Sequence, residues 1–258
     1  MATVYSIVNQ KGGVGKTTTA VNLASATAMA GRSTLLIDSD PQANATSGLG
    51  LRSQEHKTLY PILLGIEPVE SAILKTEVPG LDLLPSDHHL IGTEVELVSF
   101  KGREARLKQA IDRLRAKYDF IFVDCPPSLG LLTINALTAA DALIIPIQCE
   151  YYALEGLGNL LRTIEQVDQA FNKKLKIEGI LLTMYDGRNN ISHQVAQEVE
   201  KHFASQVFKT IIPRNVRLSE APSFGKPIHL YDPTSRGAIS YQELARELLS
   251  RSAIGGTA

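Results

Sequence analysis

Short apolar runs rich in β-branched residues alternate along this chain with longer amphipathic segments. The apolar runs predict strands near residues 4–8, 34–37, 81–84, 119–123, 142–147 and 177–183. The amphipathic segments predict helices near residues 17–30, 103–116, 152–170 and 191–203. Such alternation is typical of a parallel sheet that is buried on both faces. We therefore expect an α/β fold of three layers, in which a mostly parallel twisted sheet carries helices on both faces.

The composition fits a chain that forms one core. With 258 residues the chain is long enough to bury most of its apolar surface, so we expect a single domain at residues 1–252 and a disordered tail at 253–258. The formal charge of −1 gives no general attraction to nucleic acid or lipid, and no apolar stretch is long enough for a membrane span. Cys125 and Cys149 lack metal-binding or disulfide spacing, which favours a reducing cytoplasm.

A glycine-rich loop directly follows the first predicted strand. Residues 11–18 have the sequence KGGVGKTT and lead into the first predicted helix. Glycines let the backbone approach a ligand closely, so successive N–H groups can face phosphate oxygens. In such loops the lysine reaches the β- and γ-phosphates and the next hydroxyl binds Mg²⁺, which assigns these roles to Lys16 and Thr17. The sequence thus predicts a P-loop NTPase fold, whose phosphate cradle consists of Gly12, Gly13, Val14, Gly15, Lys16, Thr17 and Thr18.

Two further predicted strands end in carboxylates. Asp38 and Asp40 follow one apolar run, and Asp124 ends another. Ligands of parallel sheets lie beyond the carboxyl ends of the strands, so we expect these aspartates near the phosphates. Asp124 has the position of a carboxylate that holds Mg²⁺ through a water molecule. A single aspartate at a strand end is often only a turn or helix cap, but here two such strand ends follow a phosphate loop in chain order.

The phosphate loop departs from the common P-loop pattern. Gln10 stands where that pattern has glycine, and a second lysine, Lys11, stands at the mouth of the loop. This loop, the DSDPQ run from Asp38 and the DCPP run from Asp124 resemble the ParA/MinD family of ATPases with a deviant Walker A motif. The resemblance implies that Lys11 crosses a dimer interface to the partner's nucleotide, that Asp40 positions or activates the attacking water, and that Asp38 helps to order the magnesium shell. It also implies ATP and Mg²⁺ as cofactors, and a homodimer in the ATP state.

The distal part of the chain carries a second resemblance. Residues 211–237, which include IIPRNVRLSEAPSFGKPI and DPTSRG, are similar to the chromosomal ParA branch called Soj. The resemblance to this branch then extends from Val4 to about Leu249. It implies that Pro213 and Asn215 lie near the adenine.

The same resemblance implies two macromolecular partners. In the family the ATP dimer binds double-stranded DNA without sequence preference, and a ParB/Spo0J-like protein stimulates hydrolysis and release. The matching basic residues are Arg188 and Arg217, with Lys226 and Arg236 as weaker candidates. By itself, an isolated arginine is more often the partner of a surface ion pair. The resemblance implies a cytoplasmic protein that associates with the nucleoid when ATP is bound.

Three other classes of protein share such a phosphate loop. A MinD-like membrane-associated positioning ATPase ends in a basic amphipathic helix, but the predicted terminal helix at residues 241–251 balances glutamates against arginines and lacks Phe or Trp anchors, so no stable membrane association is expected. An electron-transfer iron protein needs paired cysteines around a shared cluster, for which Cys125 and Cys149 are poorly suited. A biosynthetic ligase stays open, although it would not explain the match at residues 211–237.

Overall fold

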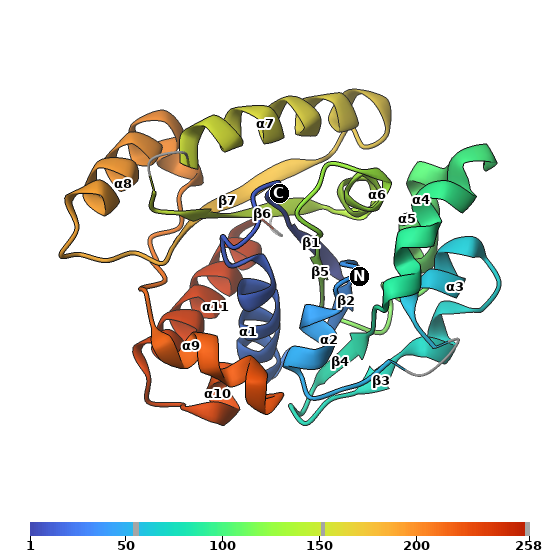
Figure 1. Ribbon diagram of the computed structural model, residues 1–258, viewed down its shortest axis with the longest axis horizontal. Coiled ribbons are helices and arrows are strands. Elements are labelled where there is room, and N and C mark those ends of the chain that lie inside the picture. Colours follow the sequence, from blue (N-terminus) through green and yellow to red (C-terminus); the bar gives the residue numbers. More distant parts are fainter. Residues whose placement is uncertain (54–56, 151–152, 256–258) are drawn as a thin grey trace.

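The computed structural model describes residues 1–53, 57–150 and 153–255, and a seven-stranded sheet forms its centre (Figure 1). The strands are β1 (Thr3–Ile7), β2 (Thr34–Asp38), β3 (Leu74–Lys75), β4 (Leu81–Leu84), β5 (Phe120–Asp124), β6 (Ala142–Gln148) and β7 (Lys176–Thr183). Their order in the sheet is β3-β4-β2-β5-β1-β6-β7, and only the edge strand β3 pairs antiparallel. The mostly parallel sheet confirms the predicted fold class.

Helices cover both faces of this sheet (Figure 1). One face packs against α1 (Lys16–Met29) and α11 (Arg236–Gly255), beside the short helices α2 (Asn44–Gly48), α9 (Val216–Glu220) and α10 (Ile228–Tyr231). The other face packs against α3 (Leu59–Leu64), α5 (Arg106–Asp112), α6 (Leu131–Ala139), α7 (Ala153–Ala170) and α8 (Asn190–Phe203), with α4 (Thr93–Glu96) beside α3 and α6. Alanine, serine and threonine make up most of α1, and these small side chains let the helix lie closely between the sheet and α11.

The register of the three central strands brings the predicted site residues to one level. β5 lies between β1 and β2, and Asp124 pairs with Ile7 on one side and with Asp38 on the other. Every residue of β2 and β5 is buried, so the hydrophobic core fixes where these strands end. The phosphate loop and both carboxylate-bearing strands therefore leave the sheet at the same edge.

The pattern of apolar residues located these strands to within one residue at each end, but it was wrong about the helix at residues 103–116. That segment is a 3-10 turn at Arg103–Ala105 followed by α5, which ends at Asp112. Beyond α5, the guanidinium of Arg115 turns inward and donates to the Asp141 carboxylate at 2.7 Å. The backbone after α5 continues in hydrogen-bonded turns, in which Leu114 and Arg115 donate to the carbonyl of Ile111 and Lys117 donates to that of Leu114.

The final helix is longer than predicted. The terminal helix was expected at residues 241–251, whereas α11 runs from Arg236 to Gly255. The predicted tail at residues 253–258 thus begins within α11, and residues 256–258 lie outside the described residues. No helix in the described ranges combines the length and the apolar character that crossing a bilayer requires.

Candidate nucleotide-binding site

The glycine-rich loop wraps around the start of α1. Gly13 and Gly15 have φ angles of 75° and 90°, in the left-handed region that glycine adopts without strain. Gly15 is the N-cap of α1 and Lys16 is its first residue. The positive end of the helix dipole therefore points into the loop, which favours an anion there.

Most of the predicted cradle lines one cavity of about 290 Å³. The cavity is lined by Gly12, Gly13, Gly15, Lys16, Thr17, Thr18, Asp40, Gln42, Asn44, Pro127 and Met184. It brings the phosphate loop together with Asp40 from the loop after β2. Val14 is buried and does not line this cavity, so its contribution to a cradle is limited to its backbone.

A second cavity of about 300 Å³ adjoins the first at Gly15, Thr18 and Met184, which line both. Its other lining residues are Thr183, Ile212, Pro213, Arg214, Asn215, Leu218, Ser219, Pro222 and Tyr241. Pro213 and Asn215 thus line a cavity that is continuous with the phosphate loop at Gly15 and Thr18. The Asn215 side-chain oxygen accepts from the backbone N–H of Leu218 at the start of α9, so its amide group remains for a ligand.

Lys16 is buried against the loop that it follows. Its ammonium group donates to the backbone carbonyl of Lys11 at 3.0 Å. Burial lowers the pKa of Lys16, while the carboxylates of Asp124 and Asp40 act in the opposite direction. Phosphate oxygens in the adjoining cavity would add negative charge and stabilise the charged ammonium.

Asp124 and Asp38 are both fully buried, but their partners differ. By geometry neither carboxylate oxygen of Asp124 has a hydrogen-bond partner among the described residues, although the Thr17 hydroxyl lies close enough to lower its pKa. Asp38 accepts from the backbone N–H of Asp40 at 3.2 Å and from the backbone and hydroxyl of Thr46 at 2.8 and 2.7 Å. Asp38 is therefore already engaged in organising the loop that carries Asp40, whereas Asp124 has oxygens left for a cation.

The pKa values of these two carboxyl groups agree with this difference. Burial and the neighbouring Asp38 hold the pKa of Asp124 well above its usual range, and the Thr17 hydroxyl and Lys16 offset only part of that effect. Burial also raises the pKa of Asp38, but the hydrogen bonds from Thr46 limit the rise to about 6. A cation beside Asp124 would remove the main cost of its charge.

The side chains of this site could bind Mg²⁺ only together with the phosphates of a bound nucleotide. In the described parts of the chain, no group of three or more His, Cys, Asp and Glu side chains could hold a metal ion. Mg²⁺ usually binds one or two carboxylates together with phosphates of the substrate and water. Thr17, which lines the phosphate cavity, and Asp124 are the side chains that fit such a site.

Lys11 and Asp40 differ in how strongly contacts within the chain fix their side chains. The Lys11 side chain is 38% exposed, and its ammonium lies 3.4 Å from a carboxylate oxygen of Glu150. Asp40 is buried at the wall of the phosphate cavity, where one of its oxygens accepts from the backbone N–H of Gln42 at 2.9 Å. The carboxylate of Asp40 is thus held in place within reach of the cavity.

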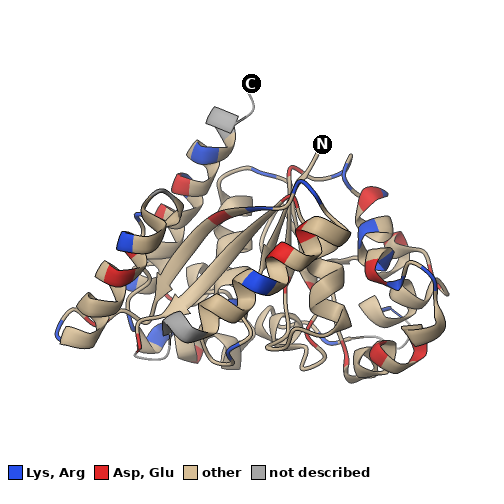
Figure 2. Cartoon of the chain, turned by 90° about the horizontal axis from the view of Figure 1, so that it is seen from above, with Lys and Arg blue, Asp and Glu red and all other residues tan. Residues whose placement is uncertain are grey.

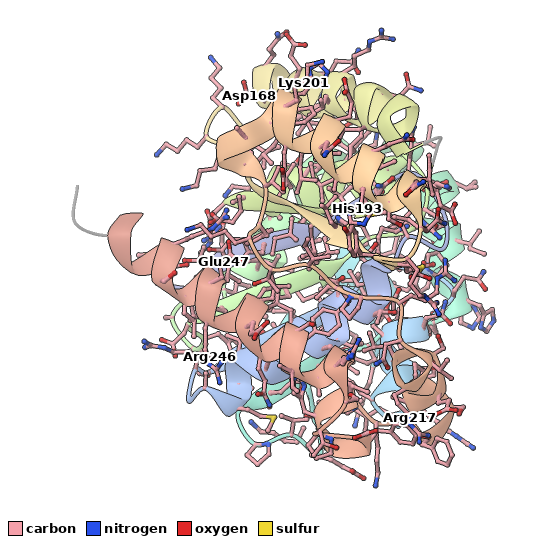
Figure 3. The ribbon with its side chains drawn as sticks, turned by 90° about the vertical axis from the view of Figure 1, so that its left-hand side faces the viewer. Asp168, His193, Lys201, Arg217, Arg246 and Glu247 are labelled. Carbon is pink, nitrogen blue, oxygen red and sulfur yellow. The ribbon has the colours of Figure 1, made fainter. Side chains whose placement is uncertain are left out.

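The two arginines that are predicted to contact DNA both form ion pairs within the chain. Arg188 donates twice to the carboxylate of Asp186, at 2.9 and 2.8 Å. Arg217 of α9, labelled in Figure 3, lies 2.9 Å from Glu220 and 3.5 Å from Asp232. Both arginines remain exposed, so a phosphate could compete for either of them.

The two weaker DNA candidates are both exposed and have no ion-pair partner among the residues that the structure describes. Arg236 opens α11, and Lys226 follows the turn after α9. Lys226 also lines a cavity of about 260 Å³ together with Thr17 and Thr18, so it lies toward the phosphate loop. Figure 2 shows basic and acidic residues interspersed over the helices in view, with no uniformly basic face there.

The sequence interpretation missed two side chains that shape the loop. Asn9 accepts from the backbone N–H of Lys11 at 3.0 Å and donates to the carbonyl of Pro146 at 2.8 Å. The hydroxyl of Thr183 donates to the carbonyl of Val14 at 2.8 Å. Both side chains lie at the carboxyl edge of the sheet, so the rule that selected the aspartates could have selected them too.

Comparison with known proteins gives matches over nearly the whole chain. A family model described as an AAA domain matches residues 2–177. Chromosome partitioning protein ParA of Caulobacter vibrioides (strain NA1000 / CB15N) is 54% identical over 251 residues, covering 96% of this chain and 94% of the relative. Sporulation initiation inhibitor protein Soj of Bacillus subtilis (strain 168) is 55% identical over 249 residues, covering 96% and 98%. The structure of cobyrinic acid a,c-diamide synthase from Mycobacterium smegmatis with bound ADP and magnesium is similar with a TM-score of 0.87 and 39% identity, covering 99% of this chain and 97% of that one.

Proposed function

The chain belongs to the ParA/Soj family of chromosome-partitioning proteins, and from this premise we propose that it is an ATPase that segregates DNA. Mg-ATP closes two subunits into a sandwich dimer, which binds double-stranded DNA without sequence preference. A ParB/Spo0J-like protein then stimulates hydrolysis and releases the dimer. The protein acts in the cytoplasm, on the nucleoid while ATP is bound. The main support is the phosphate cavity, which is lined by Lys16, Thr17 and Asp40 and lies beside Asp124, whose oxygens accept no hydrogen bond from the residues that the structure describes.

The residues around this cavity divide the work of phosphoryl transfer. Backbone N–H groups of the loop and the ammonium of Lys16 hold the phosphate oxygens in place. Thr17 and Asp124 would hold Mg²⁺, which would supply positive charge against the phosphoryl oxygens. The Asp40 carboxylate orients the attacking water and accepts its proton. The backbone N–H of Gln42 donates to Asp40 and orients its carboxylate.

Lys11 makes the site depend on a second subunit. Its ion pair with Glu150 is partly exposed, and pairs of this kind contribute little to stability, so the lysine can exchange its partner. In the ATP dimer Lys11 leaves Glu150 and contacts the nucleotide of the other subunit. A monomer lacks this additional cation, and its hydrolysis is therefore slow.

The packing of α11 supports DNA over lipid as the target of the dimer. Glu247 accepts from the backbone and the hydroxyl of Thr210 at 2.9 and 2.8 Å. The guanidinium of Arg251 donates to the carbonyl of Glu178 and lies 4.3 Å from the centre of the Phe208 ring. A helix that enters a membrane needs a free apolar face, but α11 buries Tyr241, Leu244 and Leu248 in the core that it shares with α1 and the sheet, and of its described large aliphatic side chains only Ile239 is exposed.

A biosynthetic ligase is the second candidate, because the similar M. smegmatis structure is named as a diamide synthase. The relatives that are more than half identical carry names of partitioning and sporulation proteins, which favours the first proposal. A ligase would bind Mg-ATP but would have no reason to remain on DNA. The two candidates therefore differ in a property that can be measured directly.

Co-sedimentation tests the proposal. The purified protein is mixed with double-stranded DNA, and separately with anionic liposomes, in the presence of Mg-ATP, Mg-ADP or no nucleotide, and the Asp40→Ala variant serves to hold the ATP state. We expect ATP-dependent retention on DNA that weakens steeply with salt, and no retention on liposomes. Retention on liposomes alone would favour the MinD-like alternative. Retention on neither, with ATP binding intact, would favour the ligase.

A further inference from the structure

Thr183 connects the outer part of the sheet to the phosphate loop. It is the last residue of β7, which is separated from β1 by β6, and it is almost completely buried. Its hydroxyl donates to the carbonyl of Val14 at 2.8 Å, between residues 169 positions apart in the chain. The side chain also lies next to Gly15, where an added Cβ would be 3.8 Å from the Thr183 methyl group. The contact therefore acts on the peptide that joins Val14 to Gly15.

The geometry of that peptide gives the hydrogen bond a consequence for ligand binding. In a trans peptide the carbonyl of one residue and the N–H of the next point in opposite directions, and this chain has no cis peptide among the described residues. A carbonyl of Val14 that is held toward Thr183 leaves the N–H of Gly15 directed away from β7. This N–H has no acceptor among the described residues, and Gly15 lines the phosphate cavity.

We propose that Thr183 is a positioning residue that aims the N–H of Gly15 at the β-phosphate. The proposal rests on the proposed nucleotide binding, and it adds a residue outside the glycine-rich motif. Gly15 has a left-handed φ of 90°, and glycine can occupy several backbone regions at similar cost. Without the hydroxyl of Thr183, the Val14–Gly15 peptide can rotate, and the N–H no longer points constantly at the ligand.

Replacement of the hydroxyl by a methyl group tests this role. Thr183→Val keeps the shape and the β-branching of the side chain but removes the donor. We expect the affinity for Mg-ADP to fall about tenfold, which corresponds to the net free energy of one hydrogen bond. The affinity for AMP should stay unchanged, because AMP has no β-phosphate. The measurement is competition of unlabelled ADP and AMP against a fluorescent ADP analogue.

Two further variants separate positioning from general damage. Thr183→Ser retains the donor and should restore the wild-type affinity for Mg-ADP. Thr27→Val is the matched control, because Thr27 is also buried and its hydroxyl donates to a carbonyl, that of Leu23, at 2.8 Å within α1. This control should bind both nucleotides as the wild type does.

The possible results are distinguishable. A selective loss for ADP in Thr183→Val, together with rescue in Thr183→Ser, supports the proposal. Equal losses for ADP and AMP, no loss at all, or a serine variant as weak as the valine variant would each overturn it while leaving nucleotide binding in place. A wild-type protein that binds no nucleotide would overturn the proposed function, and the role of Thr183 with it.

Discussion

Two regions of this molecule hold their charged residues in opposite ways. At the carboxyl edge of β1, β2 and β5, Lys16 and Asp124 are buried, and the Asp124 oxygens have no partner among the described residues. On the outer segments around α8 and α9, Arg188 and Arg217 are exposed, and each is paired with a carboxylate of its own chain. A buried charge without partners costs free energy, whereas an exposed pair neither costs nor contributes much. The first region therefore has charged groups that are already placed for a ligand, whereas the arginines of the second region can exchange their carboxylate partners for others.

This difference matches the role that we propose for each region. Phosphoryl transfer needs its groups fixed within a fraction of an ångström, and buried strand ends provide such rigid supports. Contacts with a DNA backbone depend mainly on charge, so exposed arginines without a fixed geometry are sufficient. Variants in the first region should therefore have large effects on nucleotide chemistry, and variants in the second should have smaller effects on DNA retention.

The largest effect is expected from Lys16→Ala. The change removes the only cation of the phosphate loop that is buried in the described structure, beside Asp124 and Asp40. Loss of one partner from a buried set of charges costs several kcal/mol, so nucleotide affinity should fall on the order of 1,000-fold. Calorimetric titration with Mg-ATP measures this change. Lys101→Ala, which removes an exposed lysine, is the control and should bind as the wild type does.

The next largest effect is expected from Asp40→Ala. The variant should bind Mg-ATP and form ATP dimers, but its turnover should fall by about 100-fold or more, because the attacking water loses its base. Phosphate release measures turnover, and size-exclusion chromatography with ATP detects the dimer. Asp112→Ala removes a half-exposed carboxylate of α5 and should hydrolyse ATP normally. Normal hydrolysis in Asp40→Ala would remove the catalytic role from this residue.

The sequence predicted the central elements of this fold because their cause is local. Strands buried on both faces need continuous apolar runs, so β2 and β5 were located closely. Helix α6 (Leu131–Ala139) was missed because it is apolar on nearly all sides and shows no amphipathic period. The edge strand β3 and the helices α9 and α10 are too short to produce a periodic pattern.

The site was predictable to the extent that it is contiguous in the chain. The glycine-rich loop is a single run of residues, and Asp40 and Asp124 follow apolar strands, so the motif and the strand rule identified them. Thr183 comes from a strand two places away in the sheet, and its role depends on the strand order. The pairing of Arg217 with Asp232 likewise depends on how α9 and the following segment pack, whereas its pair with Glu220 is a local i,i+3 contact within α9. The strand-end rule could have named Thr183 as a candidate, but the sequence alone does not show that Thr183 contacts Val14 or that Arg217 contacts Asp232.

A smaller effect is expected from Arg217→Glu, which tests whether the outer region exchanges its partners. The variant should hydrolyse ATP as the wild type does when DNA is absent, but its affinity for DNA should fall about tenfold. The salt dependence should flatten by about 0.9 in slope for each phosphate that the variant no longer neutralises. Glu220→Gln is the matched opposite change. It removes one intramolecular partner of Arg217, so it should strengthen DNA binding. If Arg217→Glu were retained on DNA as well as the wild type, Arg217 would not contact DNA, and Lys226 and Arg236 would be the next residues to test.

The smallest effect is expected from Glu247→Gln in α11. Unlike the exposed pairs of Arg188 and Arg217, the pair between Glu247 and Arg251 is partly buried and holds the helix in place. Burial alone would raise the pKa of Glu247, but hydrogen bonds from Lys209, Thr210 and Arg251 outweigh it, and the pKa is lowered. A carboxyl group whose pKa is lower in the folded state stabilises the folded protein when the pH is above the pKa of the unfolded state, near 4.5. This contribution is lost as the pH falls through the pKa of the folded state.

The glutamine variant should therefore be less stable than the wild type by about 1 kcal/mol at pH 7, and the difference should shrink below about pH 4.5. Urea denaturation at several pH values measures it, and Glu243→Gln, an exposed residue of the same helix, is the control that should change nothing. Nucleotide affinity should stay at the wild-type level, because Glu247 lines neither cavity of the candidate site. If Glu247→Gln were as stable as the wild type at pH 7, the end of α11 would be less firmly held than its hydrogen bonds indicate. The packing of α11 would then no longer count against the membrane alternative, and the liposome measurement would have to decide.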